Sequence, residues 1–339
     1  MKILIVGPSW VGDAVMAQTL YKLIKKYNDD YKIEVLSPNW SIPILERMEE
    51  VSRSIISPFN HGEINIKARY DLGKKLRQED YDRAIIMSNS LKSSLIPFFA
   101  NIPLRTGWLG EMRFGFINDI RSKEKNSYPL MIEQFAKLGI KPIEDINGAL
   151  PHPSLRVDSQ NLDKQLNNLK IDLHKPSLAI CPGAEFGPAK KWPSGYYAEV
   201  CNYYLSKSWN VLVFGSPNDE TTGNTIEEEI NRELLGGFYN LIGKTSLVDA
   251  IDLLSHCKKV VTNDSGLMHI SAAVDTPLVA VYGPSSPQFT PPLIENHVVL
   301  RKSEGFEKVR EGSEDHGHHE SLMAIKPNEV LEGLERLGK

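Results

Sequence analysis

The chain has 339 residues, which exceeds what a single hydrophobic core usually supports, so we expect two domains. Its 39 Lys and Arg against 43 Asp and Glu give a net charge of −4, which argues against a nucleic-acid-binding protein and requires a local site for any anionic ligand. Cys181, Cys201 and Cys257 are isolated along the sequence, which argues against a disulfide framework and favours buried side chains in a reducing compartment.

The hydropathy of the chain argues against membrane insertion. No stretch approaches the roughly 18 apolar residues of a membrane-spanning helix, and the first apolar run is too short for the core of a signal peptide. We therefore expect a cytoplasmic protein that at most lies against a membrane.

Apolar runs of strand length alternate with helical stretches, a pattern typical of parallel sheets covered on both faces. In the first half of the chain, strands are predicted at residues 2–6, 32–36, 53–56 and 81–87. A helix begins near Asp13, and its apolar side chains recur at helical spacing. This predicts one buried face made by Met16, Leu20, Leu23, Ile24 and Tyr27.

The alternation starts again in the second half, where strands are predicted at residues 177–181, 210–214, 239–242, 259–262 and 278–282. Ser246 and Asp249 form a capping box, and the helix that follows has a predicted buried stripe at Leu247, Ala250, Ile251 and Leu254. The segment 151–175 is the predicted interdomain connection. The fold class is therefore α/β: two doubly wound Rossmann-like domains, residues 1–160 and 161–339, facing each other across a cleft that holds two substrates.

The turn Gly7-Pro8-Ser9-Trp10-Val11-Gly12-Asp13 follows the first strand and leads into a helix. Its two glycines suggest a phosphate-binding loop, but Asp13 and Ala14 stand where a nucleotide-hydrolysing P-loop needs Lys and then Ser or Thr. A P-loop NTPase is therefore disfavoured. Two interpretations of Asp13 stay open: it caps the helix, or its carboxylate accepts a proton from an acceptor molecule.

Two further segments of the first half are candidates for lining the same crevice. Residues 89–93 follow the strand that ends near Met87, at its carboxyl end. Residues 105–114 mix basic and aromatic side chains, which suits an anionic amphiphile at a membrane surface and equally suits an ordinary surface loop.

In the second half, residues 260–269 run from a strand through a tight turn into a helix. Ser265 and Gly266 would expose backbone amides at the helix N-terminus, which favours a diphosphate. The alternative is that Asp264 caps the helix and His269 is a packed helical residue. Residues 182–193 carry Lys190 and Lys191 after another strand, where a cation would neutralise a leaving diphosphate, although paired lysines also occur on solvated surfaces.

Two remaining features are weaker signals. Residues 282–287 follow a strand and would shape the same crevice or form only a turn. His316, His318 and His319 cluster near the end of the chain, but no Cys or carboxylate spacing completes a metal site, so surface imidazoles are the favoured interpretation.

In this order, the motifs resemble the ADP-heptose:lipopolysaccharide heptosyltransferases, glycosyltransferase family 9. The resemblance covers essentially the whole chain and rests on residues 7–13, 89–93, 105–108, 110–113, 182–190, 263–269 and 282–287. It implies the GT-B architecture and inverting transfer of L-glycero-D-manno-heptose from ADP-heptose to the first heptose of the lipopolysaccharide inner core, without a metal cofactor. The implied partners are ADP-heptose and a lipid-linked core acceptor at the inner leaflet of the inner membrane.

The resemblance also implies site residues, position by position. Asp13 looks like the general base, and Lys190 looks like the diphosphate-binding lysine. The implied donor-binding residues are Gly12, Glu185, Lys190, Lys191, Thr245, Asp264, Ser265, Gly266 and His269. The implied acceptor-binding residues are Ser9, Trp10, Asn89, Lys92 and Arg113. Either Asp219 or Glu220 takes the place of an acidic ribose contact, His318 stands where an aromatic residue is expected, and the last helix would pack back on the first domain.

Two other functions remain open at this point. One is a related GT-B transferase that uses a different nucleotide sugar or acceptor. The other is a nucleotide-binding regulatory protein that has kept the cleft without chemistry, although the presence of both Asp13 and Lys190 argues against it.

Overall fold

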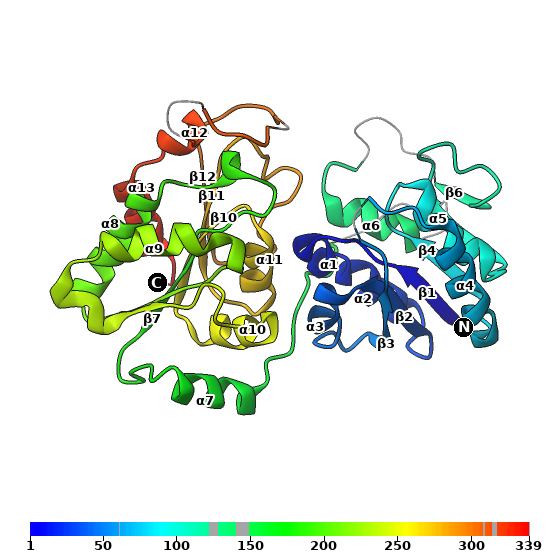
Figure 1. Ribbon diagram of the computed structural model, residues 1–339, viewed down its shortest axis with the longest axis horizontal. Coiled ribbons are helices and arrows are strands. Elements are labelled where there is room, and N and C mark those ends of the chain that lie inside the picture. The colour runs from blue at the N-terminus through cyan, green and yellow to red at the C-terminus, as the bar shows by residue number, and fades with distance from the viewer. Residues whose placement is uncertain (61, 122–127, 140–148, 308, 314–316, 339) are drawn as a thin grey trace. The chain divides into compact units, whose positions relative to one another are not determined.

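The computed structural model describes residues 1–60, 62–121, 128–139, 149–307, 309–313 and 317–338. The chain divides into two compact units, residues 1–153 and 154–339, and each contains one six-stranded sheet (Figure 1). The strand order is β3-β2-β1-β4-β5-β6 in the first sheet and β12-β11-β10-β7-β8-β9 in the second. Counted from each unit's own first strand, both are the order 3-2-1-4-5-6 of the Rossmann fold, which confirms the predicted pair of Rossmann-like domains.

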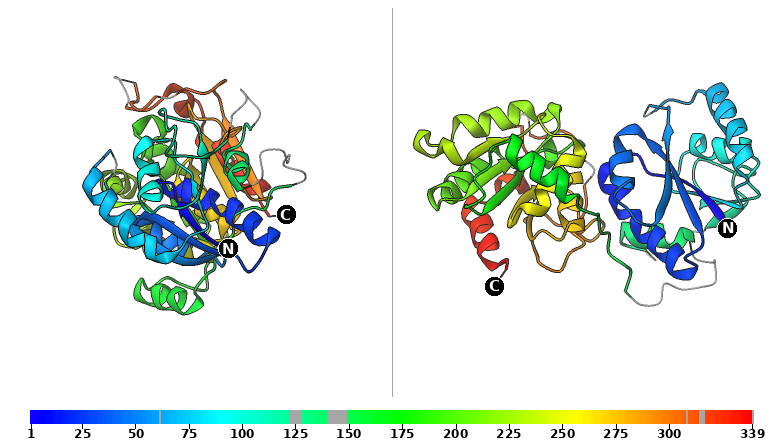
Figure 2. Two further views of the ribbon diagram at one scale, coloured as in Figure 1. Left: turned by 90° about the vertical axis from the view of Figure 1, so that its right-hand side faces the viewer. Right: turned by 90° about the horizontal axis from the view of Figure 1, so that it is seen from below.

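The first unit has a parallel sheet between two helical layers (Figure 2). Because side chains alternate along a strand, Leu4 and Val6 of β1 join the apolar cluster under the helices α4 (Ile66–Leu76) and α5 (Leu91–Phe99), and Ile3 and Ile5 point to the other face. The strands are β1 (Lys2–Val6), β2 (Lys32–Pro38), β3 (Val51–Ser57), β4 (Arg83–Ile86), β5 (Leu104–Trp108) and β6 (Asp119–Arg121). The helices are α1 (Val11–Met16), α2 (Gln18–Tyr27), α3 (Ile42–Leu45), α4 (Ile66–Leu76), α5 (Leu91–Phe99) and α6 (Met131–Gly139), with 3-10 turns at Asn39–Ser41 and Arg77–Glu79.

The second unit repeats this plan. Its strands are β7 (Ser177–Cys181), β8 (Asn210–Val213), β9 (Phe238–Asn240), β10 (Lys259–Asn263), β11 (Leu278–Tyr282) and β12 (His297–Arg301). Its helices are α7 (Ser159–Asn168), α8 (Ser194–Ser206), α9 (Glu220–Glu228), α10 (Leu247–His256), α11 (Gly266–Ala273), α12 (Glu320–Met323) and α13 (Pro327–Arg336), with 3-10 turns at Pro188–Lys190, Pro217–Asp219 and Arg232–Gly237. The strands β7, β8 and β11 are buried throughout, as expected for parallel strands covered on both faces.

The last helix, α13, packs against its own unit, and its predicted return to the first domain stays a prediction. Val330 and Leu334 of α13 are fully buried in the apolar cluster that also contains Tyr197 of α8 and Val279 of β11. The apolar face of α13 therefore packs against the second sheet and α8.

The unit boundary also lies earlier than the predicted division after residue 160. The backbone N–H of Leu155 donates to the carbonyl of Ala273 at 2.8 Å, and that of Asp158 donates to Oδ1 of Asp252 at 2.9 Å. These bonds attach the segment before α7 to α10 and α11, so it belongs to the second unit.

Most predicted strands are confirmed, whereas β5, β6 and β12 were not predicted. The sequence of β5, Leu-Arg-Thr-Gly-Trp, contains no apolar run, and β12 is a half-buried edge strand whose apolar run spans only residues 298–300. The predicted helix near Asp13 is interrupted at Ala17, and Tyr27, predicted to be buried, is 74% exposed at the end of α2.

Two expectations drawn from composition have structural counterparts. All three cysteines are free and buried, as predicted. Across the described residues, no helix combines the length and the apolar character needed to cross a bilayer.

Candidate active site

The same topological rule places the loops of both units. In a doubly wound sheet, ligands bind outside the carboxyl ends of the strands, where the strand order reverses. That point lies between β1 and β4 in the first unit and between β7 and β10 in the second. The loops that follow these four strands contain the main motifs of the sequence. Each unit therefore carries one candidate half-site.

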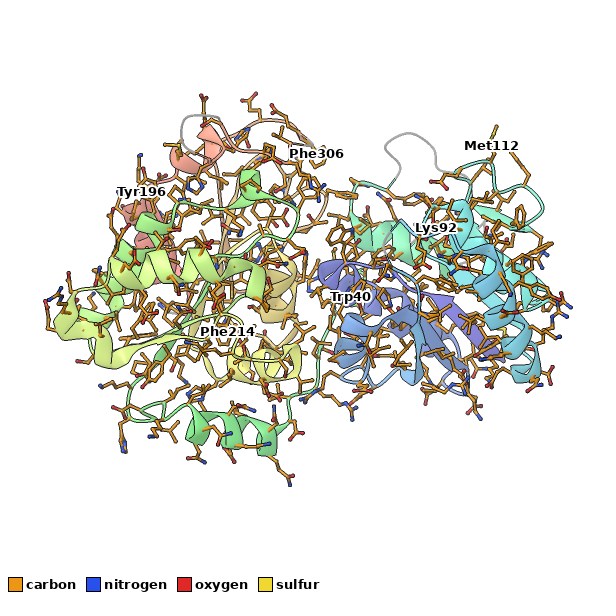
Figure 3. All side chains as sticks on the ribbon, viewed as in Figure 1. Trp40, Lys92, Met112, Tyr196, Phe214 and Phe306 are labelled. Carbon is orange, nitrogen blue, oxygen red and sulfur yellow. The ribbon has the colours of Figure 1, made fainter. Side chains whose placement is uncertain are left out.

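The turn after β1 (the β1 turn, residues 7–13) forms part of the first half-site. Trp10 is the N-cap residue of α1, and Asp13 is the third residue of the helix rather than its cap. The carbonyl of Ser9 accepts a hydrogen bond from Nε1 of Trp40, a residue labelled in Figure 3, at 2.9 Å. The Trp10 side chain is exposed. Asp13 and Gly12 are half-buried in the first turn of α1. The predicted base and the predicted contacts Ser9 and Trp10 thus share one short segment.

The loop after β4 (the β4 loop, residues 88–93) lies at the other side of the reversal point. Asn89 is exposed and Lys92 is half-exposed in the first turn of α5, where an acceptor could reach them. Arg113 was predicted to bind the acceptor with them, but its side chain is 0% exposed. Its guanidinium donates to backbone carbonyls of the β4 loop and to Trp108, so this prediction is corrected: the hydrogen-bonding groups of Arg113 face the protein interior.

In the second unit, the loop after β7 (the β7 loop, residues 182–193) meets the turn after β10. Nζ of Lys190 lies 2.6 Å from Oδ2 of Asp264, and this ion pair joins the two loops at the reversal point. The Lys190 ammonium also lies 5.4 Å from the ring centroid of Phe186. Ser265 is the N-cap residue of α11, so Asp264 is not the cap, and the ion pair lies next to the N-terminus of this helix. A fixed cation and the first N–H groups of α11 therefore lie close together.

The second lysine of the β7 loop is paired elsewhere. Nζ of Lys191 lies 2.7 Å from Oδ1 of Asp219, whose Oδ2 accepts hydrogen bonds from the N–H and Oγ of Ser216. Gly183 leaves room for this carboxylate, since a Cβ there would lie 2.5 Å from Oδ2 of Asp219. Asp219 is buried and joins the β7 loop to the loop after β8, whereas its neighbour Glu220 is exposed.

Comparison with known proteins identifies the family. A family model described as glycosyltransferase family 9 (heptosyltransferase) matches residues 69–318. Over 342 aligned residues, the chain is 46% identical to lipopolysaccharide heptosyltransferase 2 of Salmonella typhimurium, covering 99% of this chain and 98% of the relative. Lipooligosaccharide heptosyltransferase 2 of Haemophilus influenzae is 44% identical, with 99% of both chains covered. The chain belongs to glycosyltransferase family 9.

Solved structures agree with this assignment. The structure of E. coli ADP-heptose lipopolysaccharide heptosyltransferase II matches with a TM-score of 0.90 at 42% identity, covering 99% of this chain and 98% of that one. The E. coli heptosyltransferase WaaC with ADP has the same fold, with a TM-score of 0.68 at 20% identity and 99% of both chains covered. The resemblance inferred from the motifs, and the enzyme class that it implied, are thereby confirmed.

Three further residues of this family 9 chain, Thr245, Glu185 and Gly266, were predicted to contact the donor. The structure confirms the predicted capping box of Ser246 and Asp249 at the start of α10. Thr245 is half-exposed just before it, and its Oγ1 donates to the carbonyl of Leu241 at 3.5 Å. Glu185 is exposed in the β7 loop, and Gly266 is the first residue of α11. Their contact with a donor stays a prediction.

The histidine cluster has local structural roles. The imidazole Nδ1 of His318 lies 2.9 Å from the carbonyl of Lys191, and His319 is the N-cap residue of α12. His316 lies outside the described residues. Within the described ranges, no group of three or more His, Cys, Asp or Glu side chains is arranged to hold a metal ion.

Sequence reasoning assigned no role to Asn263, which organises the second half-site. Its Oδ1 accepts hydrogen bonds from the N–H of Trp192 and the hydroxyl of Tyr197, and its Nδ2 donates to the carbonyl of Pro182. The side chain is fully buried and ties both ends of the β7 loop to β10. The sequence feature that could have indicated this role is a side-chain amide at the last position of a buried strand, directly before Asp264.

His269 is buried in α11, close to the Lys190–Asp264 pair. Burial lowers its pKa to about 4, with Asp264 acting in the opposite direction, so the imidazole is neutral at pH 7. Its Nδ1 is buried and has no hydrogen-bond partner among the residues that the structure describes. His269 is therefore a packed helical residue, which was one of the two predicted alternatives.

Acid is expected to destabilise the protein through His269. Its folded-state pKa of about 4 lies below the unfolded value of 6.5, so the unfolded chain binds more protons between these values and stability is lost as the pH falls from about 6.5 toward 4. Between pH 7.5 and pH 5 the loss should be about 2 kcal/mol. Urea unfolding of wild type and His269→Gln at both pH values measures it. The variant should show a smaller pH dependence, and equal dependences would contradict the prediction.

Proposed function

We propose that this chain is an inverting heptosyltransferase that transfers heptose from ADP-heptose to the first heptose of the lipopolysaccharide inner core. Its family and its full-length relatives are heptosyltransferases. The observation that carries the chemistry is the position of Lys190, held by Asp264 next to the N-terminus of α11 at the reversal point of the second sheet. A nucleoside diphosphate is the ligand that such a cation and such amides favour.

On the donor side, Lys190 would bind the diphosphate without giving up Asp264, because an ammonium has three N–H donors. As the bond between the anomeric carbon and the phosphate oxygen breaks, negative charge grows on the departing ADP. Lys190 and the first N–H groups of α11 would stabilise that charge in the way that a divalent cation does in other transferases. Glu220 is the better candidate for the ribose contact, because it is exposed and the carboxylate of Asp219 is engaged by Lys191 and Ser216.

On the acceptor side, Asp13 would accept the proton of the attacking heptose hydroxyl. The oxygen forms a new bond to the anomeric carbon from the face opposite ADP, which inverts the configuration. A carboxylate is a weak base toward a free alcohol, so the proton transfers late, when the attacking oxygen has become acidic. This mechanism requires that both half-sites serve one reaction.

A lipid-linked acceptor is supported by the turn after β5 (the β5 turn, residues 109–114). Met112 is 79% exposed, and Leu109 and Phe114 are exposed on the same turn. Figure 3 shows Met112 on this turn and Lys92 at the start of α5. Residues 1–153 carry 21 Lys and Arg against 18 Asp and Glu, whereas residues 154–339 carry 18 against 25. Apolar side chains on the more basic unit are suited to an anionic membrane surface.

The decisive experiment is mass spectrometry of heptosylated Kdo-lipid A after incubation with the purified protein and ADP-heptose. We expect the mass of one added heptose, and the same rate in excess EDTA. ADP should raise the melting temperature more than UDP does, because only a bound ligand stabilises by mass action. Preferential stabilisation by UDP would favour a transferase with another donor. Binding of ADP without any transfer would favour a regulatory protein.

A further inference from the structure

Arg113 is the most completely buried charged side chain next to the first half-site. Its Nη1 donates to the carbonyls of Ser88 at 2.8 Å and Ser90 at 3.3 Å and lies 3.4 Å from Oγ of Ser93. Its Nη2 donates to the carbonyl of Trp108 at the end of β5. One guanidinium therefore joins the β4 loop to the neighbouring strand.

The β5 turn holds the β4 loop at two further points. The carboxylate of Glu111 accepts a hydrogen bond from the N–H of Leu91 at 2.7 Å, at the first residue of α5. Gly110 packs so tightly on the loop that a Cβ would lie 2.7 Å from the carbonyl oxygen of Asn89. These contacts fix the backbone immediately on both sides of Asn89.

The other side of the β4 loop is held from α4. Nη1 of Arg69, which is also buried, donates to the carbonyl of Lys92 at 3.2 Å. The backbone of the loop is thus fixed at Ser88, Ser90 and Lys92 by two buried guanidinium groups, and at Leu91 by the exposed carboxylate of Glu111. The side chain of Asn89 stays exposed and that of Lys92 half-exposed. A loop held in this way presents its side chains in one geometry, which is what substrate positioning requires.

We propose that Arg113 is a positioning residue for the acceptor: it holds the β4 loop so that Asn89 and Lys92 bind the acceptor, without touching the acceptor itself. This inference rests on the proposed function. The planar fork of the guanidinium reaches several carbonyls at once, a geometry that a lysine ammonium does not reproduce. Its complete burial separates this role from a direct ion pair with an anionic acceptor.

Arg113→Lys and Arg113→Met distinguish positioning from direct charge. Both variants should raise the acceptor KM by about tenfold and leave the ADP-heptose KM and the Kd of ADP unchanged, because the donor half-site lies in the other unit. With saturating acceptor, kcat should stay close to the wild-type value. If Arg113→Lys keeps the wild-type acceptor KM while Arg113→Met loses it, the charge acts directly and the proposal is overturned. Unchanged acceptor KM in both variants also overturns it.

Arg83→Lys is the matched control. Arg83 lies in the same unit, is well shielded, and donates to Thr106 and to the carbonyls of Leu138 and Gly139, away from the β4 loop. It should leave the acceptor KM unchanged. An equal rise would mean that any lost buried arginine weakens the unit, and would overturn the proposal.

A surface variant keeps the test decisive if the Arg113 variants fail to fold. Glu111 is exposed, so Glu111→Ala removes the carboxylate that accepts the hydrogen bond from the Leu91 N–H and has little effect on the hydrophobic core. Glu111→Ala should raise the KM for the acceptor substrate about threefold. Glu111→Gln keeps a side-chain oxygen for this hydrogen bond, so its KM for the acceptor substrate should equal the wild-type value. No change in Glu111→Ala overturns the proposal. Failure of the wild-type protein to transfer heptose would instead count against the proposed function.

Discussion

Asp13→Asn is expected to lower kcat by about a thousandfold, because a positioned general base contributes about 10²- to 10⁴-fold. The amide has the shape of the carboxylate but does not accept the proton of the attacking hydroxyl. Binding of ADP-heptose should be nearly unchanged, because its predicted contacts other than Gly12 lie in the second unit. Single-turnover transfer measures the rate, and calorimetry measures the donor affinity.

The control for this variant is Asp29→Asn, which removes a carboxylate that is 96% exposed in the same unit. It should leave kcat, donor affinity and melting temperature unchanged. A wild-type kcat in Asp13→Asn would remove Asp13 from the mechanism. Loss of donor binding together with kcat would show that the residue acts on binding and not only on proton transfer.

Lys190→Met should lower kcat/KM for ADP-heptose by at least about a hundredfold, since removal of one preorganised charge-stabilising donor costs on the order of 3 kcal/mol. It also leaves Asp264, which is 7% exposed, without its ion-pair partner beside the diphosphate site. The affinity for ADP should fall strongly, whereas that for adenosine, which has no phosphate, should stay the same. Calorimetric titration with both ligands checks this difference.

Lys191→Met provides the contrast within the same loop. Lys191 binds the buried carboxylate of Asp219, so its loss should lower the melting temperature and loosen the connection between the loops after β7 and β8. Its effect on ADP relative to adenosine should be much smaller than that of Lys190→Met. Equal loss of ADP affinity in both variants would contradict the distinct roles assigned to the two lysines.

Local sequence signals predicted the elements that carry both half-sites. The strands β1, β7 and β11 have the predicted bounds because each is a short apolar run flanked by turn residues. The capping box of Ser246 and Asp249 was predicted for the same reason, since its two reciprocal bonds join residues three positions apart. The β1 turn and the β7 loop follow strands, so their place at the carboxyl edge of a parallel sheet could also be inferred.

The pairing of side chains could not be inferred in this way. Lys190 and Lys191 are neighbours of the same type, yet one pairs with Asp264 and the other with Asp219. Arginine side chains are usually exposed, so no feature of the sequence indicated that Arg113 is buried under the β4 loop. The strand β5 has no apolar run and that of β12 is only three residues long, so local pattern predicts neither strand. Their pairing with neighbouring strands compensates for this weak local propensity.

The amino-acid sequence by itself determined the α/β class, the two Rossmann-like domains, the family and the segments that carry the candidate residues, because these follow from short-range periodicity and from motifs of a few adjacent residues. Only the tertiary structure decided the unit boundary, the place of α13, the choice between Asp219 and Glu220 as an exposed carboxylate, and the burial of Arg113 and His269. The physical reason is that burial and ion pairing depend on groups far apart in the chain, such as Lys190 and Asp264, which only the order of the strands brings together.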